Sequence, residues 1–106
     1  MKTYAAQFDA LGDPMRRAII ERLLASPRPV GVLARGLPIS RPAVSQHLRI
    51  LKAARLVTDH AEGTRRVYAI DPRGFAALRD YLDRFWTDAL AAFKREAEST
   101  KPRQRP

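Results

Sequence analysis

The chain has 106 residues and a formal net charge of +9, which fits one small, basic domain. It contains no cysteine, so disulfide bonds, thiolate metal ligands and thiol redox sensing are excluded. No window reaches the roughly 18 apolar residues of a membrane span, and the N-terminus has no apolar signal core, so we expect a cytoplasmic protein without a membrane partner.

Positive charge is concentrated in the middle of the chain. Residues 41–70 carry six basic and two acidic side chains, whereas residues 71–98 carry five basic and six acidic ones. A basic patch confined to one part of a domain favours nucleic acid as the partner. The competing explanation is an arginine content that reflects only the base composition of the genome.

Two helices are predicted at the start of the chain. Residues 4–11 place three apolar side chains on one helical stripe and predict the first helix. Asp13 and Pro14 then have the chemistry of an N-cap and a first helical residue. The apolar positions of this second helix follow the helical period: Met15, Ile19, Ile20, Leu23 and Leu24. Residues 26–29 include two prolines and predict a stiff linker.

The residues after this linker predict a helix-turn-helix. A short helix is expected over residues 30–36 and a tight turn over residues 37–39. The next helix begins after the N-cap Ser40, with Pro42 in its first turn, and ends near Ala54. Its apolar residues Val44, Leu48 and Leu51 lie on one face and anchor it to a core. Two short helices in this arrangement form the DNA-binding helix-turn-helix pattern.

The outer face of the helix over residues 40–54 carries hydrogen-bond donors and no carboxylate: Arg41, Ser45, Gln46, Arg49 and Lys52. Duplex DNA offers matching acceptors. We assign base-edge contacts to Arg41, Gln46 and Arg49, because Arg matches guanine and Gln matches adenine in the major groove. The competing explanation is a solvated face on an ordinary globular helix.

The remaining polar residues of this helix are given other roles. Ser40, Ser45 and Lys52 are expected to contact phosphates or the minor groove. His47 lies close to the apolar side of the helix. Two roles stay open for it: a half-buried side chain with an internal hydrogen bond, or a DNA contact.

A β-hairpin is predicted directly after this helix. Residues 56–61 and 65–70 are β-prone runs separated by Glu62-Gly63-Thr64, and glycine in so short a loop is typical of a hairpin. A two-stranded ribbon in this position is a wing. Its turn holds Thr64, Arg65 and Arg66, which can reach phosphates or a minor groove. Alternatively, the paired arginines only protect a strand edge from aggregation.

A long helix is predicted from Pro72 to about Glu98, which corresponds to ~40 Å. Its apolar residues step by three and four, and so small a domain cannot bury the whole stripe. We therefore expect a homodimer. The predicted interface residues are Tyr4, Phe8, Phe75, Leu78, Leu82, Phe85, Trp86, Ala89 and Phe93. Alternatively, the helix folds back along its own domain. Residues 1–98 form the expected domain, and residues 99–106 form a basic, disordered tail.

The chain resembles the ArsR/SmtB winged-helix repressors over about Tyr4 to Glu98. Three segments carry the resemblance: Phe8 to Ile20, Leu37 to Leu48 and Leu56 to Tyr68. It implies a mainly α (α+β) fold, namely a winged helix-turn-helix with a two-stranded β-wing and a long C-terminal dimerisation helix. It also implies a homodimer that binds an inverted-repeat operator and usually represses its own gene and neighbouring genes. The helix over residues 40–54 would lie in the major groove, and the hairpin at Gly63 would be the wing.

The departures from this family concern its metal sites. Many members sense metals through a cysteine pair in a segment that matches residues 30–34 here, which hold none. Others bind zinc on the last helix, but both histidines, His47 and His60, lie elsewhere. The aspartates of that helix alone would be a poor zinc site. We expect no metal and no cofactor, and the chain resembles the metal-independent autorepressors, whose effector does not follow from the fold.

Two other function classes compete with a sequence-specific regulator. A winged helix can act as a protein-interaction module, although here both the helix over residues 40–54 and the wing are basic. A non-specific architectural DNA binder would share the charge but not the sequence preference. An enzyme is not expected, because the sequence holds no Ser-His-acid set, glycine-rich phosphate loop or paired metal-ligand motif.

Overall fold

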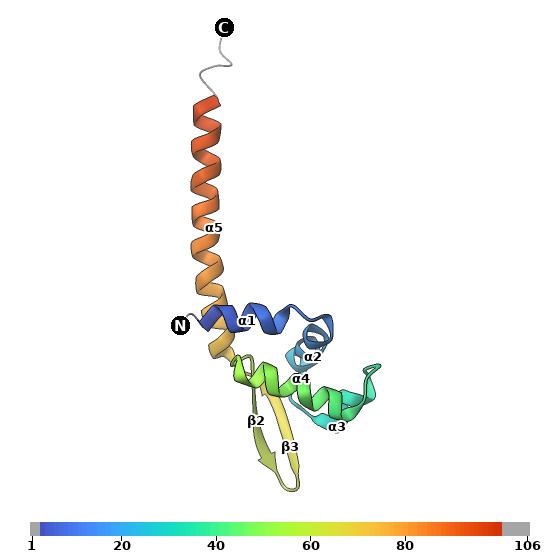
Figure 1. Ribbon diagram of the computed structural model, residues 1–106. Helices are drawn as coiled ribbons and strands as arrows, with labels where there is room; N and C mark the ends of the chain where they lie inside the picture. Colours follow the sequence, from blue (N-terminus) through green and yellow to red (C-terminus); the bar gives the residue numbers. More distant parts are fainter. Residues whose placement is uncertain (1–2, 101–106) are drawn as a thin grey trace.

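The structure, a computed structural model, describes residues 3–100, with the side chains of residues 5–99. Helices α1 and α2 open the chain, and α3 and α4 follow a short strand, β1. Strands β2 and β3 form a hairpin, and one long helix, α5, extends away from the other elements (Figure 1). The bounds are α1 Thr3–Leu11, α2 Pro14–Ala25, β1 Arg28–Pro29, α3 Val30–Arg35, α4 Arg41–Ala53, β2 Val57–Glu62, β3 Arg65–Ile70 and α5 Pro72–Thr100.

The predicted helix starts are confirmed by their capping bonds. The carboxylate of Asp13 accepts hydrogen bonds from the backbone nitrogens of Met15 at 2.7 Å and Arg16 at 3.2 Å. The hydroxyl of Ser40 accepts one from the backbone nitrogen of Ala43 at 3.2 Å. These oxygens satisfy amides that have no partner inside their helices, so the local sequence fixes where α2 and α4 begin.

The sheet differs from the predicted two-stranded wing. It has three antiparallel strands in the order β1-β3-β2, and Arg28 pairs with Tyr68 while Pro29 pairs with Val67. The prediction that residues 26–29 are only a linker is therefore wrong. Proline has no N–H to donate, but it is tolerated on an edge strand, and β1 lies at the edge of the sheet. This pairing places α3, which begins directly after β1, beside the wing.

The core is built around the inner face of α4. Val44, Leu48 and Leu51 have no exposed surface, as their spacing predicted. Complete burial of one such side chain contributes roughly 1.5–3 kcal/mol relative to exposure. The buried apolar cluster comprises Ala10, Ile19, Ile20, Leu23, Leu33, Val44, Leu48, Leu51, Ala54, Leu56 and Val57. Because α4 is packed on this side, its opposite face is held in a fixed orientation toward solvent.

Within the described residues, only the first turns of α5 pack against the other elements. Phe75 lies against the core of its own domain, although it was predicted at a subunit interface. Phe8 of α1 contacts Tyr81 edge to face, with 5.5 Å between ring centroids, and Tyr81 stacks on Phe85 at 6.3 Å. Beyond this point α5 does not fold back, and the molecule extends over 74 Å.

Five large apolar side chains, the α5 stripe, stay 43% to 72% exposed: Leu82, Phe85, Trp86, Leu90 and Phe93. The side chain of Tyr4, another predicted interface residue, lies outside the described part. Helix α5 continues through Ser99 to Thr100, so the prediction of a disordered tail is wrong for these two residues, and the rest of that prediction, residues 101–106, also lies outside the described part. No helix within residues 3–100 has the length and apolar character needed to cross a membrane.

Candidate nucleic-acid interface

The outer face of α4 presents the side chains that the sequence assigned to DNA. Ser45, Gln46 and Arg49 are exposed, and none of their three side chains has a hydrogen-bond or ion-pair partner within the described residues. Ser40 and Arg41 are also exposed at the start of the helix. The structure therefore brings these residues together on one free surface with donors available.

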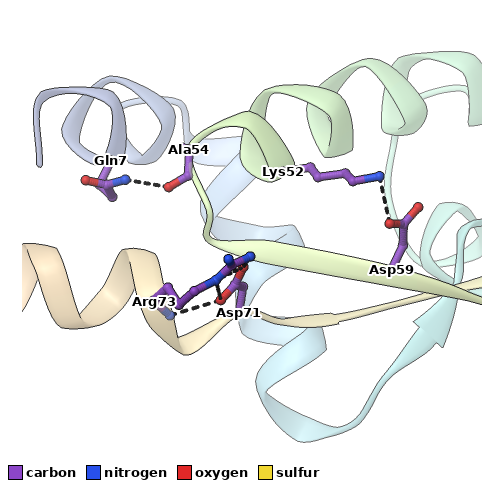
Figure 2. A network of polar contacts seen from close by, with 6 residues as sticks. All are labelled: Gln7, Lys52, Ala54, Asp59, Asp71 and Arg73. Carbon is purple, nitrogen blue, oxygen red and sulfur yellow. Dashed lines mark hydrogen bonds and ion pairs between the residues drawn. The ribbon is translucent and has the colours of Figure 1, made fainter. Parts of the chain in front are cut away.

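Lys52 and Arg66, both predicted to contact phosphates, meet at Asp59 of β2. The ammonium nitrogen of Lys52 lies 2.8 Å from one carboxylate oxygen, and a guanidinium nitrogen of Arg66 lies 3.3 Å from the other. The Lys52 contact is visible in Figure 2. The Asp59 side chain is only 6% exposed. The hydrogen bond from Lys52, together with the positive charges of Lys52 and Arg66, holds the pKa of Asp59 below its ordinary value despite burial.

Sequence reasoning missed Asp59, although a signal for it existed. Alternation along β2 places Val57 and Asp59 on the same face of the strand, and Val57 is buried. A carboxylate on that face must find positive partners, and α4 and β3 supply them. The result is a bridge that fixes the wing relative to α4.

The wing turns through two residues. Gly63 has φ +62°, and Glu62 pairs with Arg65 across the turn. A glycine at positive φ is what a tight two-residue hairpin requires. Thr64 and Arg65 are exposed at the tip, as the sequence predicted for the wing.

His47 has an internal partner. Its Nδ1 lies 3.3 Å from a guanidinium nitrogen of Arg16, whose other nitrogens donate to the carbonyl oxygens of Ala10 at 2.6 Å and Asp9 at 3.3 Å. Arginine can only donate, so His47 Nδ1 is the acceptor in this contact. Of the two open roles for His47, the structure favours the internal one, which joins α4 to the end of α1.

The C-terminal end of α4 is held by α1 and α5. The side-chain amide of Gln7, which is 2% exposed, donates to the carbonyl oxygen of Ala54 (Figure 2). The backbone nitrogen of Gly74 donates to the carbonyl oxygen of Arg55 at 2.8 Å. A side-chain carbon at Gly74 would overlap that same oxygen. These contacts, the α4 junction, connect α4 to both elements of the predicted dimer interface.

Asp71 closes the same region at the start of α5. Its carboxylate accepts from the backbone nitrogen of Arg73 at 3.0 Å and from the Arg73 guanidinium at 2.7 Å, as Figure 2 shows. The hydrogen bond from Arg73 lowers the pKa of Asp71. The backbone nitrogen of Asp71 donates to the carbonyl oxygen of Leu56 at 3.0 Å. Asp71 therefore caps α5 as predicted and also joins α5 to the residues that follow α4.

No three histidine, aspartate or glutamate side chains within the described residues lie close enough to hold a metal ion.

Comparison with known proteins places this arrangement among bacterial regulators. The family model described as "Helix-turn-helix domain" matches residues 11–60. The HTH-type transcriptional regulator Rv2034 of Mycobacterium tuberculosis is 58% identical over 102 residues, which cover 93% of this chain and 95% of that protein. The transcriptional repressor SdpR of Bacillus subtilis is 38% identical over 60% of this chain and 71% of its own length.

Solved structures of similar fold are also transcriptional regulators or DNA-binding domains. An ArsR-like transcriptional regulator from Rhodococcus sp. RHA1 has a TM-score of 0.75 and 32% identity, with 90% of this chain and 92% of that one covered. The homodimeric winged helix-turn-helix DNA-binding domain of Mb0332 from Mycobacterium bovis has a TM-score of 0.65 and 25% identity, with 93% and 83% covered. The buried face of α4, its donor-rich outer face and the adjoining wing fit these relatives, and the chain belongs to the ArsR/SmtB family of winged helix-turn-helix transcriptional regulators, which bind DNA and are not enzymes.

Proposed function

We propose that this protein is a homodimeric repressor that binds an inverted-repeat operator and represses its own gene and neighbouring genes. The proposal rests on the presence of two exposed surfaces in one molecule: a donor-rich face on α4 and the apolar α5 stripe. Binding to operator DNA would place the protein in the cytoplasm.

The α5 stripe supports the dimer. Five large apolar side chains from Leu82 to Phe93 remain exposed on one helix, and contiguous exposed apolar surface of this kind marks an interaction site. A twofold axis would pair the stripe with its own copy, together with Phe8 of α1. The homodimeric Mb0332 domain, which is similar in fold, supports the same assembly.

The DNA contacts are divided by chemistry. Gln46 and Arg49 are proposed to read base edges in the major groove, because their side chains are free on the outer face of α4. Phosphate or minor-groove contacts are proposed for Ser40, Ser45, Lys52, Thr64, Arg65 and Arg66. The residues up to the end of α5 would act as the DNA-binding and dimerisation domain, and the basic residues 101–106 would follow it. The repressor SdpR, which this chain resembles, supports repression as the outcome of binding.

A competition titration tests this function. The full chain is titrated, at fixed salt, against a labelled duplex from upstream of its own gene, with a scrambled duplex of equal length as competitor. Two chains should bind each cognate site, and scrambled duplex should compete poorly. Equal binding to both duplexes would instead favour an architectural DNA binder. Binding to neither would favour a protein-interaction module.

A further inference from the structure

A cleft of about 400 Å³ lies between α3, the start of α4 and the wing, and four arginines line it. Arg35 comes from α3, Arg41 from α4, and Arg65 and Arg66 from β3. None of the described residues that line the cleft carries a carboxylate. Residues that are far apart in the sequence therefore bring four positive charges to one concave place.

Most of these charges are unpaired. Within residues 5–99, the side chains of Arg35, Arg41 and Arg65 have no hydrogen-bond or ion-pair partner, whereas the Arg66 guanidinium is bound to Asp59 at 3.3 Å. Guanidinium groups held close together repel one another, and a bound anion relieves this repulsion. Their planar forks match the oxygen pairs of a phosphate group.

The position of Arg41 is specific to the cleft. A side-chain carbon added at Gly31 would lie 3.7 Å from a guanidinium nitrogen of Arg41, so the end of this side chain lies against α3. The sequence had assigned Arg41 to base edges, together with Gln46 and Arg49. Its place in the structure fits a contact to the DNA backbone beside the major groove better than a contact to base edges inside it.

We propose that this cleft binds a phosphodiester group of the DNA backbone, with Arg35 and Arg41 as its principal ligands. The inference rests on the proposed function. Helix α4 and the wing would enter a major and an adjoining minor groove, and the backbone strand that separates these grooves must pass between them. The cleft lies at that place. Arg35 thereby becomes a DNA contact, and Arg41 contributes affinity that does not depend on sequence.

Salt dependence is the first test. Arg35→Ala and Arg41→Ala are each titrated against cognate and scrambled duplex over a range of salt. Arg95→Ala, an exposed position near the C-terminal end of α5, is the matched charge control. Each lost phosphate contact reduces the slope of log K against log salt by about 0.9, so a dimer should lose about 1.8. Affinity should fall by the same factor on both duplexes. Arg35→Lys and Arg41→Lys should retain most of the slope.

Neutral phosphate analogues locate the contact. Single methylphosphonate groups are placed along the cognate duplex, and one position in each half-site should weaken the unmodified protein. The same position should have no further effect on the double variant Arg35→Ala/Arg41→Ala. Thermal melting of each variant without DNA confirms that these exposed substitutions leave the fold intact.

Three results would overturn the proposal. Slopes equal to that of Arg95→Ala would remove Arg35 and Arg41 from the phosphate contacts. A loss for Arg41→Ala on the cognate duplex alone would return that residue to base reading. If millimolar inorganic phosphate raises the melting temperature of the unmodified protein but not of the double variant, while the slopes are unchanged, the cleft takes free phosphate instead. Failure of the unmodified protein to bind either duplex is a different result, because it removes the proposed function itself.

Discussion

Gln7 of α1 donates a hydrogen bond to the carbonyl oxygen of Ala54, the residue that caps the end of α4. Both groups are buried, and 47 positions separate the two residues. Helix α1 also contacts α5 through Phe8 and Tyr81. Packed and hydrogen-bonded atoms therefore connect α5 to the end of α4, and in the proposed dimer the α4 junction would set the orientation in which α4 meets DNA.

Gly74→Ala should test how closely the α4 junction is packed. The new methyl group would overlap backbone atoms of Arg55, and backbone cannot move aside cheaply, so we expect a loss of about 1–3 kcal/mol in the free energy of unfolding. Gly31→Ala is the control, because the added carbon would make ordinary contacts and alanine favours a helix. Urea unfolding at one protein concentration measures the free energy of unfolding of both variants. Equal effects of the two substitutions would mean that the junction is not closely packed.

Asp59→Asn should remove the bridge between the wing and α4. We expect a loss of roughly 1–2 kcal/mol at pH 7, because Lys52 and Arg66 lose a charged acceptor. The folded-state pKa of Asp59 lies below its ordinary value near 3.8. This stabilisation is therefore present above pH 4 and is lost as the pH falls through the folded-state pKa. Asp71, whose pKa is lowered mainly by the hydrogen bond from Arg73, adds to the same acid-side loss.

Urea unfolding at several pH values between 7 and 2 measures this effect. The difference in stability between the unmodified protein and Asp59→Asn should shrink toward the acid end. Asp80→Asn, on an exposed part of α5, should change stability by less than about 0.5 kcal/mol. A difference for Asp59→Asn that is constant from pH 7 to pH 2 contradicts the ion bridge.

Phe85→Glu should separate the dimer. Phe85 is 59% exposed in the single chain, and a carboxylate in the α5 stripe would be buried without a partner if two stripes met. Ala91→Glu is the control, because by 100° steps residue 91 lies on the side of the helix opposite the middle of the α5 stripe, where it is exposed. Sedimentation should show monomers for Phe85→Glu and dimers for Ala91→Glu. A stable dimer of Phe85→Glu would place the interface elsewhere.

Arg49→Ala should reduce discrimination between sequences. A bidentate contact to guanine is worth about 1–3 kcal/mol against the wrong base, so affinity should fall more for the cognate duplex than for the scrambled one. Arg66→Ala is the contrast, because loss of a phosphate contact weakens both duplexes alike and lowers the salt slope. The two titrations share duplexes and buffer. If Arg49→Ala weakens both duplexes by the same factor, Arg49 does not read bases.

Local sequence predicted much of this fold. The caps Asp13 and Ser40, the spacing of Val44, Leu48 and Leu51, and the turn at Gly63 are short-range signals, and each is confirmed. Spacing also separated the two faces of α4, and so placed its polar residues on the exposed face. These features depend on residues a few positions apart, where helical and strand periodicity act directly.

Contacts between distant residues could not be predicted in the same way. Pro29 looks like part of a linker until β3 lies beside it. Gln7 looks like an ordinary polar residue on a helix until the end of α4 covers it. The cleft is the clearest case, because Arg35 and Arg65 are 30 positions apart and meet only when β1 pairs with β3.

A hydroxyl-radical footprint on a duplex from upstream of the gene tests the central claim, that two α4 helices read one operator as a symmetric pair. We expect two protected segments related by twofold symmetry, with their centres about 34 Å, or one helical turn, apart, or a multiple of that distance. Phe85→Glu should lose both segments together at concentrations where the dimer gives full protection. One isolated segment, or protection spread evenly along the duplex, would contradict the claim.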